Sequence, residues 1–406
     1  MVAFKTRYLT SRLSKLRHFS STIIANDIDF SHTVIGAGVV GLAVGAVLAK
    51  QSPTNSVLII EKNETFGQET SSRNSEVVHA GLYYPEDSLK TKFCIQGKNW
   101  IYENKDKFPV RQCGKWIIAQ TDEEEDYLMQ LHQKSKRIGV STEFIPLELA
   151  KRLEPKVVAR KAILNSPTTG ITSSHSIMEY LLTDFKNNNG EIAFGTKVSA
   201  IQKIGGAGAG FEIKTTSGES GEQEQEQEFV VRSNYVVNCA GLQAAEIHNM
   251  VKNDYPLEMF YAKGNYFSYN GPKLGVERLL YPCPTPGVAS LGTHLTIDLG
   301  GQVKFGPDLE WLPETPDWSG ENVYKVNSAN LKSAYLQVTR YLPDIKLENL
   351  NGSYSGIRPK LVPKGKSAHD FFVKGYDDGF VTVAGIESPG LTAAYAIGLN
   401  VGQFFR

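Results

Sequence analysis

The chain has 406 residues, of which 41% are hydrophobic and 21% charged, so it can form two or three globular domains without disulfide bonds. Lys and Arg together number 43, as do Asp and Glu, which argues against a protein that binds nucleic acid through bulk charge. The four cysteines are far apart and no histidines have metal-ligand spacing, so we expect no metal site. No apolar run reaches the ~20 residues of a membrane-spanning helix.

The first 26 residues differ in composition from the rest of the chain. They contain five Lys and Arg residues, seven Ser and Thr residues and no acidic residue. An Arg- and Ser-rich segment without acids is typical of a mitochondrial transit peptide. We therefore expect residues 1–26 to direct the protein to mitochondria, to the matrix or the inner-membrane face; the alternative is a basic tail with no targeting role.

A βαβ unit is predicted next along the chain. Residues 33–36 form a short strand that ends in glycine, residues 39–50 an apolar, Ala-rich helix, and residues 57–60 a buried strand. The motif Gly-x-Gly-x-x-Gly over residues 36–41 joins the first strand to the helix. This arrangement of strand, glycine loop and helix is the fingerprint of a dinucleotide-binding fold.

Each residue of this fingerprint has a physical reason. Gly36 permits the tight turn, Gly38 lets a pyrophosphate approach the backbone, and Gly41 lets the helix pack against the strand. The helix N-terminus offers free N–H groups and a positive dipole end to phosphates. Glu61 lies 20 residues after Gly41, near the spacing expected for an acid that accepts hydrogen bonds from ribose hydroxyls.

The later elements change in character along the chain. In order, we predict a strand at 113–119, helices at 122–138 and 176–187, strands at 211–215 and 229–238, and alternating strands over 256–310. The charged run of Glu and Gln at 217–228 predicts a solvated hairpin tip. The alternating, Gly- and Pro-rich region indicates an antiparallel sheet. The sequence therefore predicts a parallel α/β unit interleaved with an antiparallel one.

Three segments favour FAD over NAD as the dinucleotide. Small hydroxyl and amide residues at 70–75 suit an extended FAD, and the apolar strand at 235–241 ends in Ala-Gly, which allows close contact. Residues 381–392 predict a strand, a turn and a helix whose N-terminus can face the flavin ring and stabilise negative charge there. The candidate cofactor-binding residues are Gly36, Gly38, Gly41, Glu61, Lys62, Ser72, Arg73, Asn74, Ser75, Ala240, Gly241, Gly385, Ser388, Pro389, Gly390, Leu391 and Thr392.

At these residues the chain resembles the FAD-dependent oxidoreductases of the D-amino-acid-oxidase-like superfamily, and within it the L-2-hydroxyglutarate dehydrogenase family. The matching segments are SSRNSEVVHAGLYYP, NCAGL, KGNYF, RPKL and GIESPGLT. The resemblance implies oxidation of L-2-hydroxyglutarate to 2-oxoglutarate in mitochondria, often with peripheral attachment to the inner membrane. The acidic run at 219–228 departs from the family pattern.

The resemblance also implies a fold of class α/β with two interleaved domains. A Rossmann-type FAD-binding domain with a parallel sheet would comprise residues 27–105, 160–255 and 350–406. An α+β substrate domain, built on an antiparallel sheet over the flavin, would comprise residues 106–159 and 256–349.

Oxidation of a 2-hydroxy acid requires a hydride acceptor, a base for the hydroxyl proton and cations for the carboxylates. His79 is the first candidate for the base and His294 the second; the alternatives are structural histidines, histidines that pack on the flavin or, for His79, a covalent flavin link. Arg358 and Lys360 are the best candidates to bind carboxylates, because Arg matches a carboxylate bidentately. Further candidates for contact with the substrate are Lys263, Arg73, Tyr83 and Tyr266.

Three matters stay open at this level. The electron acceptor is a quinone, an electron-transfer flavoprotein or oxygen. An FAD-dependent amine or amino-acid oxidase on the same fold is the alternative enzyme, because an amine loses hydride in a similar geometry. A flavin-binding protein without catalytic activity is the alternative outside enzymes.

Overall fold

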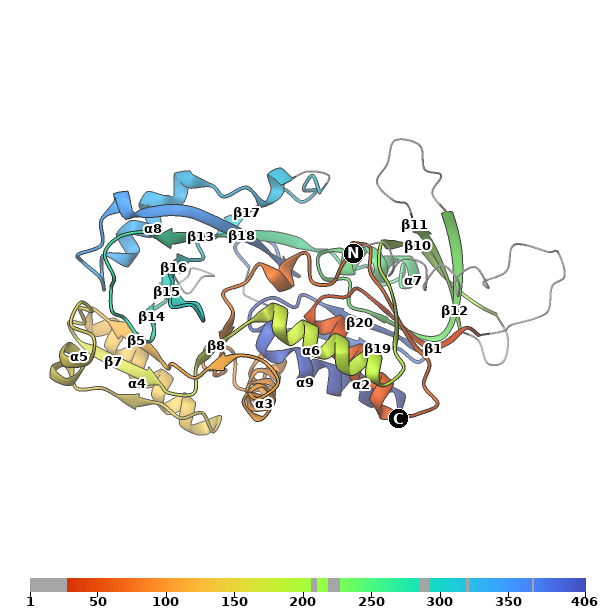
Figure 1. The fold of residues 1–406 in the computed structure, drawn as a ribbon, viewed down its shortest axis with the longest axis horizontal. Coiled ribbons are helices and arrows are strands. Elements are labelled where there is room, and N and C mark those ends of the chain that lie inside the picture. The colour runs from red at the N-terminus through yellow and green to blue at the C-terminus, as the bar shows by residue number, and fades with distance from the viewer. Residues whose placement is uncertain (1–27, 206–209, 218–226, 285–291, 319–320, 367–368) are drawn as a thin grey trace, which may run out of the picture.

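The computed structural model describes residues 28–205, 210–217, 227–284, 292–318, 321–366 and 369–406. The predicted transit peptide, residues 1–26, and the tip of the acidic hairpin lie outside these residues. The described part forms two lobes, one around a parallel sheet and its helices and one around a second sheet (Figure 1). The long strands β13 (Phe260–Tyr269) and β18 (Leu350–Lys360) run along the top of the second lobe toward the first. Within these ranges we find no helix with the length and apolarity needed to cross a bilayer.

The first sheet carries the predicted βαβ unit. Its parallel part has the order β20-β12-β1-β2-β9, and β10 and β11 extend it antiparallel from β12. All four residues of β2 are buried, as expected for a parallel strand covered on both faces. Its strands are β1 (Phe30–Ile35), β2 (Val57–Ile60), β9 (Glu191–Ala193), β10 (Thr196–Lys203), β11 (Phe211–Ser217), β12 (Gln227–Asn238), β19 (Phe372–Gly375) and β20 (Phe380–Ala384).

Helices cover one face of this sheet closely (Figure 1). A Cβ at Gly398 would lie 2.9 Å from the backbone of Ala43, so glycine lets α9 approach α2 closely. A Cβ at Gly45 would lie 2.6 Å from Ile59 Cδ1, so a larger residue there would require the Ile59 side chain to move. The other face packs against α7. These helices are α2 (Val39–Gln51), α3 (Leu89–Glu103), α6 (Ser174–Asn187), α7 (Ala244–Val251) and α9 (Gly390–Gly402).

The second sheet has the strand order β17-β13-β16-β15-β14-β5-β7-β6, in which β13 pairs with β17 at residues 262–263 and with β16 at residues 267–268. Strand β18 pairs with β13 along residues 260–269. The predicted antiparallel pairing is confirmed for all neighbours except β14 and β5, which run parallel. No short turn connects β5 to β14 in the sequence, so hairpin geometry does not fix their relative direction. The strands are β5 (Lys115–Ala119), β6 (Glu143–Phe144), β7 (Ala162–Ser166), β13 (Phe260–Tyr269), β14 (Leu279–Pro282), β15 (His294–Ile297), β16 (Val303–Gly306), β17 (Glu310–Trp311) and β18 (Leu350–Lys360).

The remaining elements connect the two sheets. A small third sheet has the order β3-β8-β4, and helices α4, α5 and α8 belong to the second lobe (Figure 1). Helix α4 begins where predicted, because the Thr121 side chain accepts a hydrogen bond from the Glu124 amide. The elements are β3 (Val77–Val78), β4 (Val110–Arg111), β8 (Gly170–Thr172), α4 (Asp122–Arg137), α5 (Leu147–Leu153) and α8 (Leu331–Val338).

The division of the chain into two domains stays a prediction. The boundaries expected from the sequence assign 160–255 and 350–406 to the FAD-binding domain. In the structure, β7 and β18 fall inside these ranges but pair within the second sheet. The chain therefore passes between the sheets at more places than those boundaries assume.

Candidate active site

A cavity of about 470 Å³ is lined by the glycine loop after β1, the segment 70–84, strands β13 and β18 and the turn before α9. A smaller cavity of about 110 Å³ lies next to it, over the glycine loop and Glu61. Gly38, Thr70, Ser71, Cys239 and Gly241 line both cavities. The two cavities thus share a wall, with the glycine fingerprint between them, as an extended dinucleotide requires.

The glycine fingerprint has the geometry predicted from its spacing. Gly36 has φ +102°, and a Cβ there would lie 2.6 Å from the Cys239 carbonyl oxygen. A Cβ at Gly41 would lie 1.9 Å from the Gly36 oxygen, so Gly41 allows the helix to pack and lies outside both cavities. Gly38 is the N-cap of α2 and has no side chain to cap it, so the amides that follow Val39 can bind a phosphate.

Glu61 is buried beside this loop. Its carboxylate accepts hydrogen bonds from the amides of Ala37 (2.7 Å) and Asn63 (2.9 Å), and burial raises its pKa. Lys62 also lines the smaller cavity, and its ammonium lies 2.8 Å from the Glu69 carboxylate. Ala240 lines this smaller cavity as well. These positions suit the adenosine half of a dinucleotide.

The segment after Glu61 contains a residue that sequence reasoning did not single out. The Ser71 hydroxyl accepts a hydrogen bond from the Val39 amide at 3.0 Å and lines both cavities. Ser72, which was predicted instead, donates to the Gly67 carbonyl and lines neither cavity. Two adjacent serines give no sequence signal that separates them. Arg73, Asn74 and Ser75 do line the larger cavity.

The turn before α9 forms another wall of the larger cavity. Gly385 has φ +65°, and α9 begins at Gly390 without a side-chain cap. Residues 388–391, which were predicted to bind the cofactor, line the cavity. Thr392 does not line it: its hydroxyl accepts a hydrogen bond from the His79 amide at 3.1 Å and donates one to the Val77 carbonyl at 3.2 Å, so it fixes the segment 77–79.

His79 lines the larger cavity and is half-buried. Its Nε2 lies 3.4 Å from the Ser388 hydroxyl, which in turn lies 3.3 Å from the Tyr84 hydroxyl. Burial, with smaller contributions from Lys115, His294 and Arg358, holds the pKa of His79 well below its usual 6.5. The imidazole is therefore neutral at pH 7 and can accept a proton.

His294 is at the start of β15 and lines the same cavity. Its Nδ1 lies 3.0 Å from the Gly292 carbonyl, and its ring stacks on Tyr281 with a centroid separation of 3.9 Å. Burial lowers its pKa to about 3. Because a carbonyl only accepts hydrogen bonds, Nδ1 carries the hydrogen and Nε2 the lone pair.

Three cations surround one carboxylate at the cavity wall. Glu387 lies 2.8 Å from Lys360, 3.2 Å from Lys90 and 3.8 Å from Arg358, and all four residues line the cavity. Burial by itself would raise the pKa of Glu387, but the three cations have the larger combined effect and hold this pKa below its usual value. The group has two more positive charges than negative ones. Arg358 and Lys360 were predicted; Lys90 and Glu387 were not.

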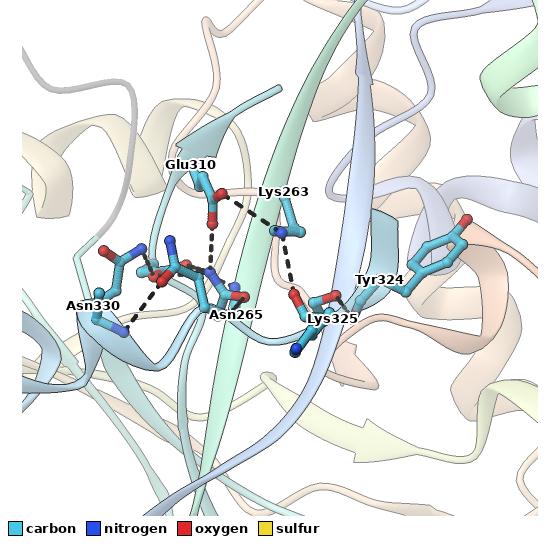
Figure 2. Close-up of polar contacts among 10 residues, drawn as sticks. Lys263, Asn265, Glu310, Tyr324, Lys325 and Asn330 are labelled. Carbon is cyan, nitrogen blue, oxygen red and sulfur yellow. Dashed lines mark hydrogen bonds and ion pairs between the residues drawn. The ribbon is translucent and has the colours of Figure 1, made fainter. Parts of the chain in front are cut away.

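Lys263, a predicted substrate contact, lies outside both cavities. Its ammonium lies 3.6 Å from Glu310 and donates to the Lys325 carbonyl at 3.1 Å. Figure 2 shows this contact within a polar network in which the Asn265 amide also donates to Glu310, at 3.3 Å. The network ties strand β13 to the segment 324–330.

The other predicted contacts lie at the larger cavity. The Arg73 guanidinium lies 4.1 Å from the centre of the Tyr324 ring. Tyr266 stacks on Tyr354 with a centroid separation of 4.4 Å. The Tyr83 hydroxyl is buried and has no hydrogen-bond partner in the described part of the chain.

The comparisons with known proteins agree with this geometry. Residues 32–403 match the family described as FAD dependent oxidoreductase. The chain belongs to this family. It is 37% identical to the mitochondrial L-2-hydroxyglutarate dehydrogenase of Arabidopsis thaliana, over 92% of this chain and 82% of that protein. It is 28% identical to the human enzyme of the same name, over 92% of this chain and 88% of that protein.

Solved structures share the fold. The FAD-bound L-alpha-glycerophosphate oxidase of Mycoplasma pneumoniae superposes with a TM-score of 0.78 at 22% identity, over 92% of this chain and 94% of that one. Glycine oxidase of Geobacillus kaustophilus gives a TM-score of 0.73 at 20% identity, over the same shares of the two chains. The chain is an FAD-dependent oxidoreductase similar to L-2-hydroxyglutarate dehydrogenases. The open N-terminus of α2, the glycine contacts and the paired cavities fit FAD.

Proposed function

We propose that this oxidoreductase converts L-2-hydroxyglutarate to 2-oxoglutarate. The observation that carries the proposal is the excess of positive charge at the larger cavity, where Arg358, Lys360 and Lys90 share the single carboxylate of Glu387. A dianion restores neutrality there, whereas a protonated amine would be repelled. The names of the relatives in Arabidopsis and human point to the same substrate.

Arg358 is the cation best placed to receive a substrate carboxylate. Its contact with Glu387 is long, at 3.8 Å, while Lys360 lies 2.8 Å from the same carboxylate. Its side chain is also 31% exposed, whereas that of Lys360 is 6% exposed. We propose that Arg358 binds the carboxylate and that Lys90 and Lys360 mainly hold Glu387 in place.

His79 is the proposed base for the substrate hydroxyl. When bound, FAD supplies the hydride acceptor, its N5 atom, for the hydrogen on C2. His79 takes the hydroxyl proton on Nε2, and the C2–O bond becomes the carbonyl of 2-oxoglutarate. Its low pKa keeps it unprotonated before the substrate arrives. Lys115 and Arg358 contribute to the low pKa of His79, and the negative charge of a bound substrate offsets their effect. Binding therefore raises this pKa and makes His79 a stronger base.

We also propose that the protein acts in mitochondria, at the matrix or on the inner-membrane face, and passes electrons to a quinone or another acceptor. The composition of residues 1–26 and the mitochondrial relatives support this location. Fractionation of cells that express the full chain tests it: recovery in the cytosol without processing would contradict it.

Anaerobic bleaching of the flavin tests the substrate. We expect L-2-hydroxyglutarate to bleach the holoenzyme and D-2-hydroxyglutarate to leave it oxidised. Bleaching by glycine, sarcosine or proline but not by L-2-hydroxyglutarate would favour the amine oxidase alternative. A purified protein that binds FAD but is bleached by none of them would favour the alternative of a flavin-binding protein without activity.

A further inference from the structure

The chemistry proposed above assigns no contact with the substrate to a buried lysine, Lys115, whose neighbours Tyr83 and Tyr281 line the larger cavity. Lys115 is the first residue of β5 and only 1% of it is exposed. Its Nζ lies 4.4 Å from the centre of the Tyr83 ring and 4.6 Å from that of Tyr281, within the range of cation–π attraction to both. Within the described ranges no carboxylate pairs with it. A charged lysine buried without an anion is costly, so an anion that binds nearby would be stabilised by its charge.

Lys115 does not line the larger cavity, but the two tyrosines beside it do. Tyr83 and Tyr281 both line it, and their rings are nearly parallel, with an interplanar angle of 10°. Both hydroxyls are buried and lack a hydrogen-bond partner among the described residues. A buried hydroxyl is nearly always satisfied, so two unpaired ones in one cavity wall point to a ligand that accepts two hydrogen bonds. A carboxylate does so with its two oxygens.

This wall is separate from the Arg358 cluster. In the second sheet, β18, which carries Arg358, and β5, which carries Lys115, are separated by β13, β16, β15 and β14. Both cations nevertheless lower the pKa of His79 and of His294, after the larger effect of burial. A dicarboxylate against these histidines therefore lies in the field of two cations from different strands.

We infer that the hydroxyls of Tyr83 and Tyr281 bind one carboxylate of a dicarboxylate ligand, and that Lys115 behind their rings supplies the positive charge for this subsite. Arg358 takes the other carboxylate. Lys115 acts through the tyrosines and is a positioning residue. The inference rests on the proposed function and adds the residues that distinguish a dicarboxylate from a monocarboxylate.

The charge of Lys115 also gives the subsite a pH dependence. Burial lowers the pKa of Lys115 to about 7. The phenols and thiols around it, whose pKa values burial raises, stay neutral: Tyr83, Tyr127, Tyr281, Cys94, Cys113 and Cys283. The histidines stay neutral because their pKa values are lowered. The other charged residues at the cavity are the ion-paired group Arg358, Lys360, Lys90 and Glu387, together with Arg73 and Asp308. Affinity for a dicarboxylate should therefore be highest below pH 7 and fall as Lys115 loses its proton.

The test compares glutarate with pentanoate, which differ only in the second carboxylate. Their dissociation constants are measured on the holoenzyme from the change in the flavin spectrum, between pH 6 and pH 8. We expect Lys115→Met to raise the dissociation constant of glutarate about tenfold or more and that of pentanoate less than about twofold. The pH dependence of glutarate binding should disappear in this variant. Tyr281→Phe keeps the ring but removes the hydroxyl, and it should raise the dissociation constant of glutarate more than that of pentanoate.

Lys98→Met is the matched control, because Lys98 is also a buried lysine with a pKa lowered by burial but lies outside the cavity. It should change neither affinity. The inference is overturned if Lys115→Met weakens both ligands equally or neither. If Lys115→Met does not fold, unchanged glutarate binding in Tyr281→Phe and Tyr83→Phe overturns it.

The proposed function can fail separately. If the wild-type protein binds glutarate no better than pentanoate, both proposals are wrong. If the wild-type protein prefers glutarate and oxidises L-2-hydroxyglutarate but Lys115→Met keeps that preference, only this inference is wrong.

Discussion

The Nζ atom of Lys360 lies 2.8 Å from the carboxylate of Glu387, which joins strand β18 of the second sheet to the turn that precedes α9. Lys90 reaches the same carboxylate from α3 at 3.2 Å. The side chains of all three residues are less than 10% exposed. Glu387 therefore connects three elements around the cavity and neutralises part of their charge.

We expect Glu387→Gln to destabilise the protein by on the order of 3–5 kcal/mol, because it leaves buried lysines without their anion. Thermal unfolding of the holoenzyme should show this as a clear drop in Tm. Glu86→Gln is the control, since it removes an exposed ion pair with Arg137 and should leave the transition where it is. An unchanged Tm in Glu387→Gln would contradict the structural role given to this residue.

Replacement of Arg358 should affect substrate binding more than turnover. We expect Arg358→Ala to raise KM for L-2-hydroxyglutarate by about 10–100-fold, with a smaller change in kcat, because a charge-assisted contact to a carboxylate is lost. Lys263→Met is the control, because Lys263 pairs with Glu310 outside the cavity. Equal effects of the two substitutions on KM would argue against the assignment of Arg358.

His79→Asn should lower kcat by about 10²–10⁴-fold and leave FAD bound, because the base is removed without a change in the cofactor wall. The visible flavin spectrum and anaerobic reduction by L-2-hydroxyglutarate measure the two effects separately. Since the pKa of His79 is lowered, kcat/KM of the wild type should not yet fall at pH 6.5. His369→Asn replaces an exposed histidine and serves as control. Near-normal turnover in His79→Asn would remove the assignment.

Local patterns predicted those parts of the site that depend on local chain geometry. The turn at Gly36, the contact at Gly41 and the position of Glu61 follow from spacing within one βαβ unit. The Lys90–Glu387 ion pair joins residues 297 positions apart, and no local pattern indicates it. Lys115 and Ser71 were missed for the same reason, because their partners come together only in the folded chain.

Lys263 shows that neighbouring residues of one strand can differ in whether they border the cavity. Lys263 and Tyr266, both in the segment KGNYF, were predicted to contact the substrate, and of these Tyr266 lines the cavity, as does Gly264. Alternate residues of a strand point to opposite faces, so Lys263 lies on the other face, next to Glu310. The sequence identified the strand but did not show which of its faces borders the cavity.

Gly38→Ala should weaken FAD binding without unfolding the protein. A Cβ at Gly38 would lie 3.0 Å from the Ser71 hydroxyl, at a position that lines both cavities, so it would obstruct the approach of a phosphate. Equilibrium titration of the apoprotein with FAD should show a dissociation constant raised by about tenfold or more. Gly205→Ala is the control, since no atom lies within 4 Å of its Cβ position. Equal FAD affinity in the two variants would contradict the role of Gly38.

Stability should fall as the pH drops below about 6.5, and His294 should account for part of the fall. In the unfolded chain a histidine takes up a proton near pH 6.5, whereas burial lowers the pKa of His294 in the folded protein to about 3. Between these values the unfolded state binds more protons, so the free energy of unfolding decreases with falling pH. At pH 5 the difference amounts to about 2 kcal/mol.

His294→Gln should therefore lose less stability than the wild type between pH 7 and pH 5, as measured by thermal unfolding at each pH. His32 is a matched comparison, because it is buried with a pKa lowered to about 4 but lies on β1 outside the cavity. His32→Gln should change the pH dependence of stability in the same direction, yet only His294→Gln should alter the affinity for glutarate. A pH profile of stability that is identical in His294→Gln and the wild type would show that His294 does not remain neutral in the folded protein.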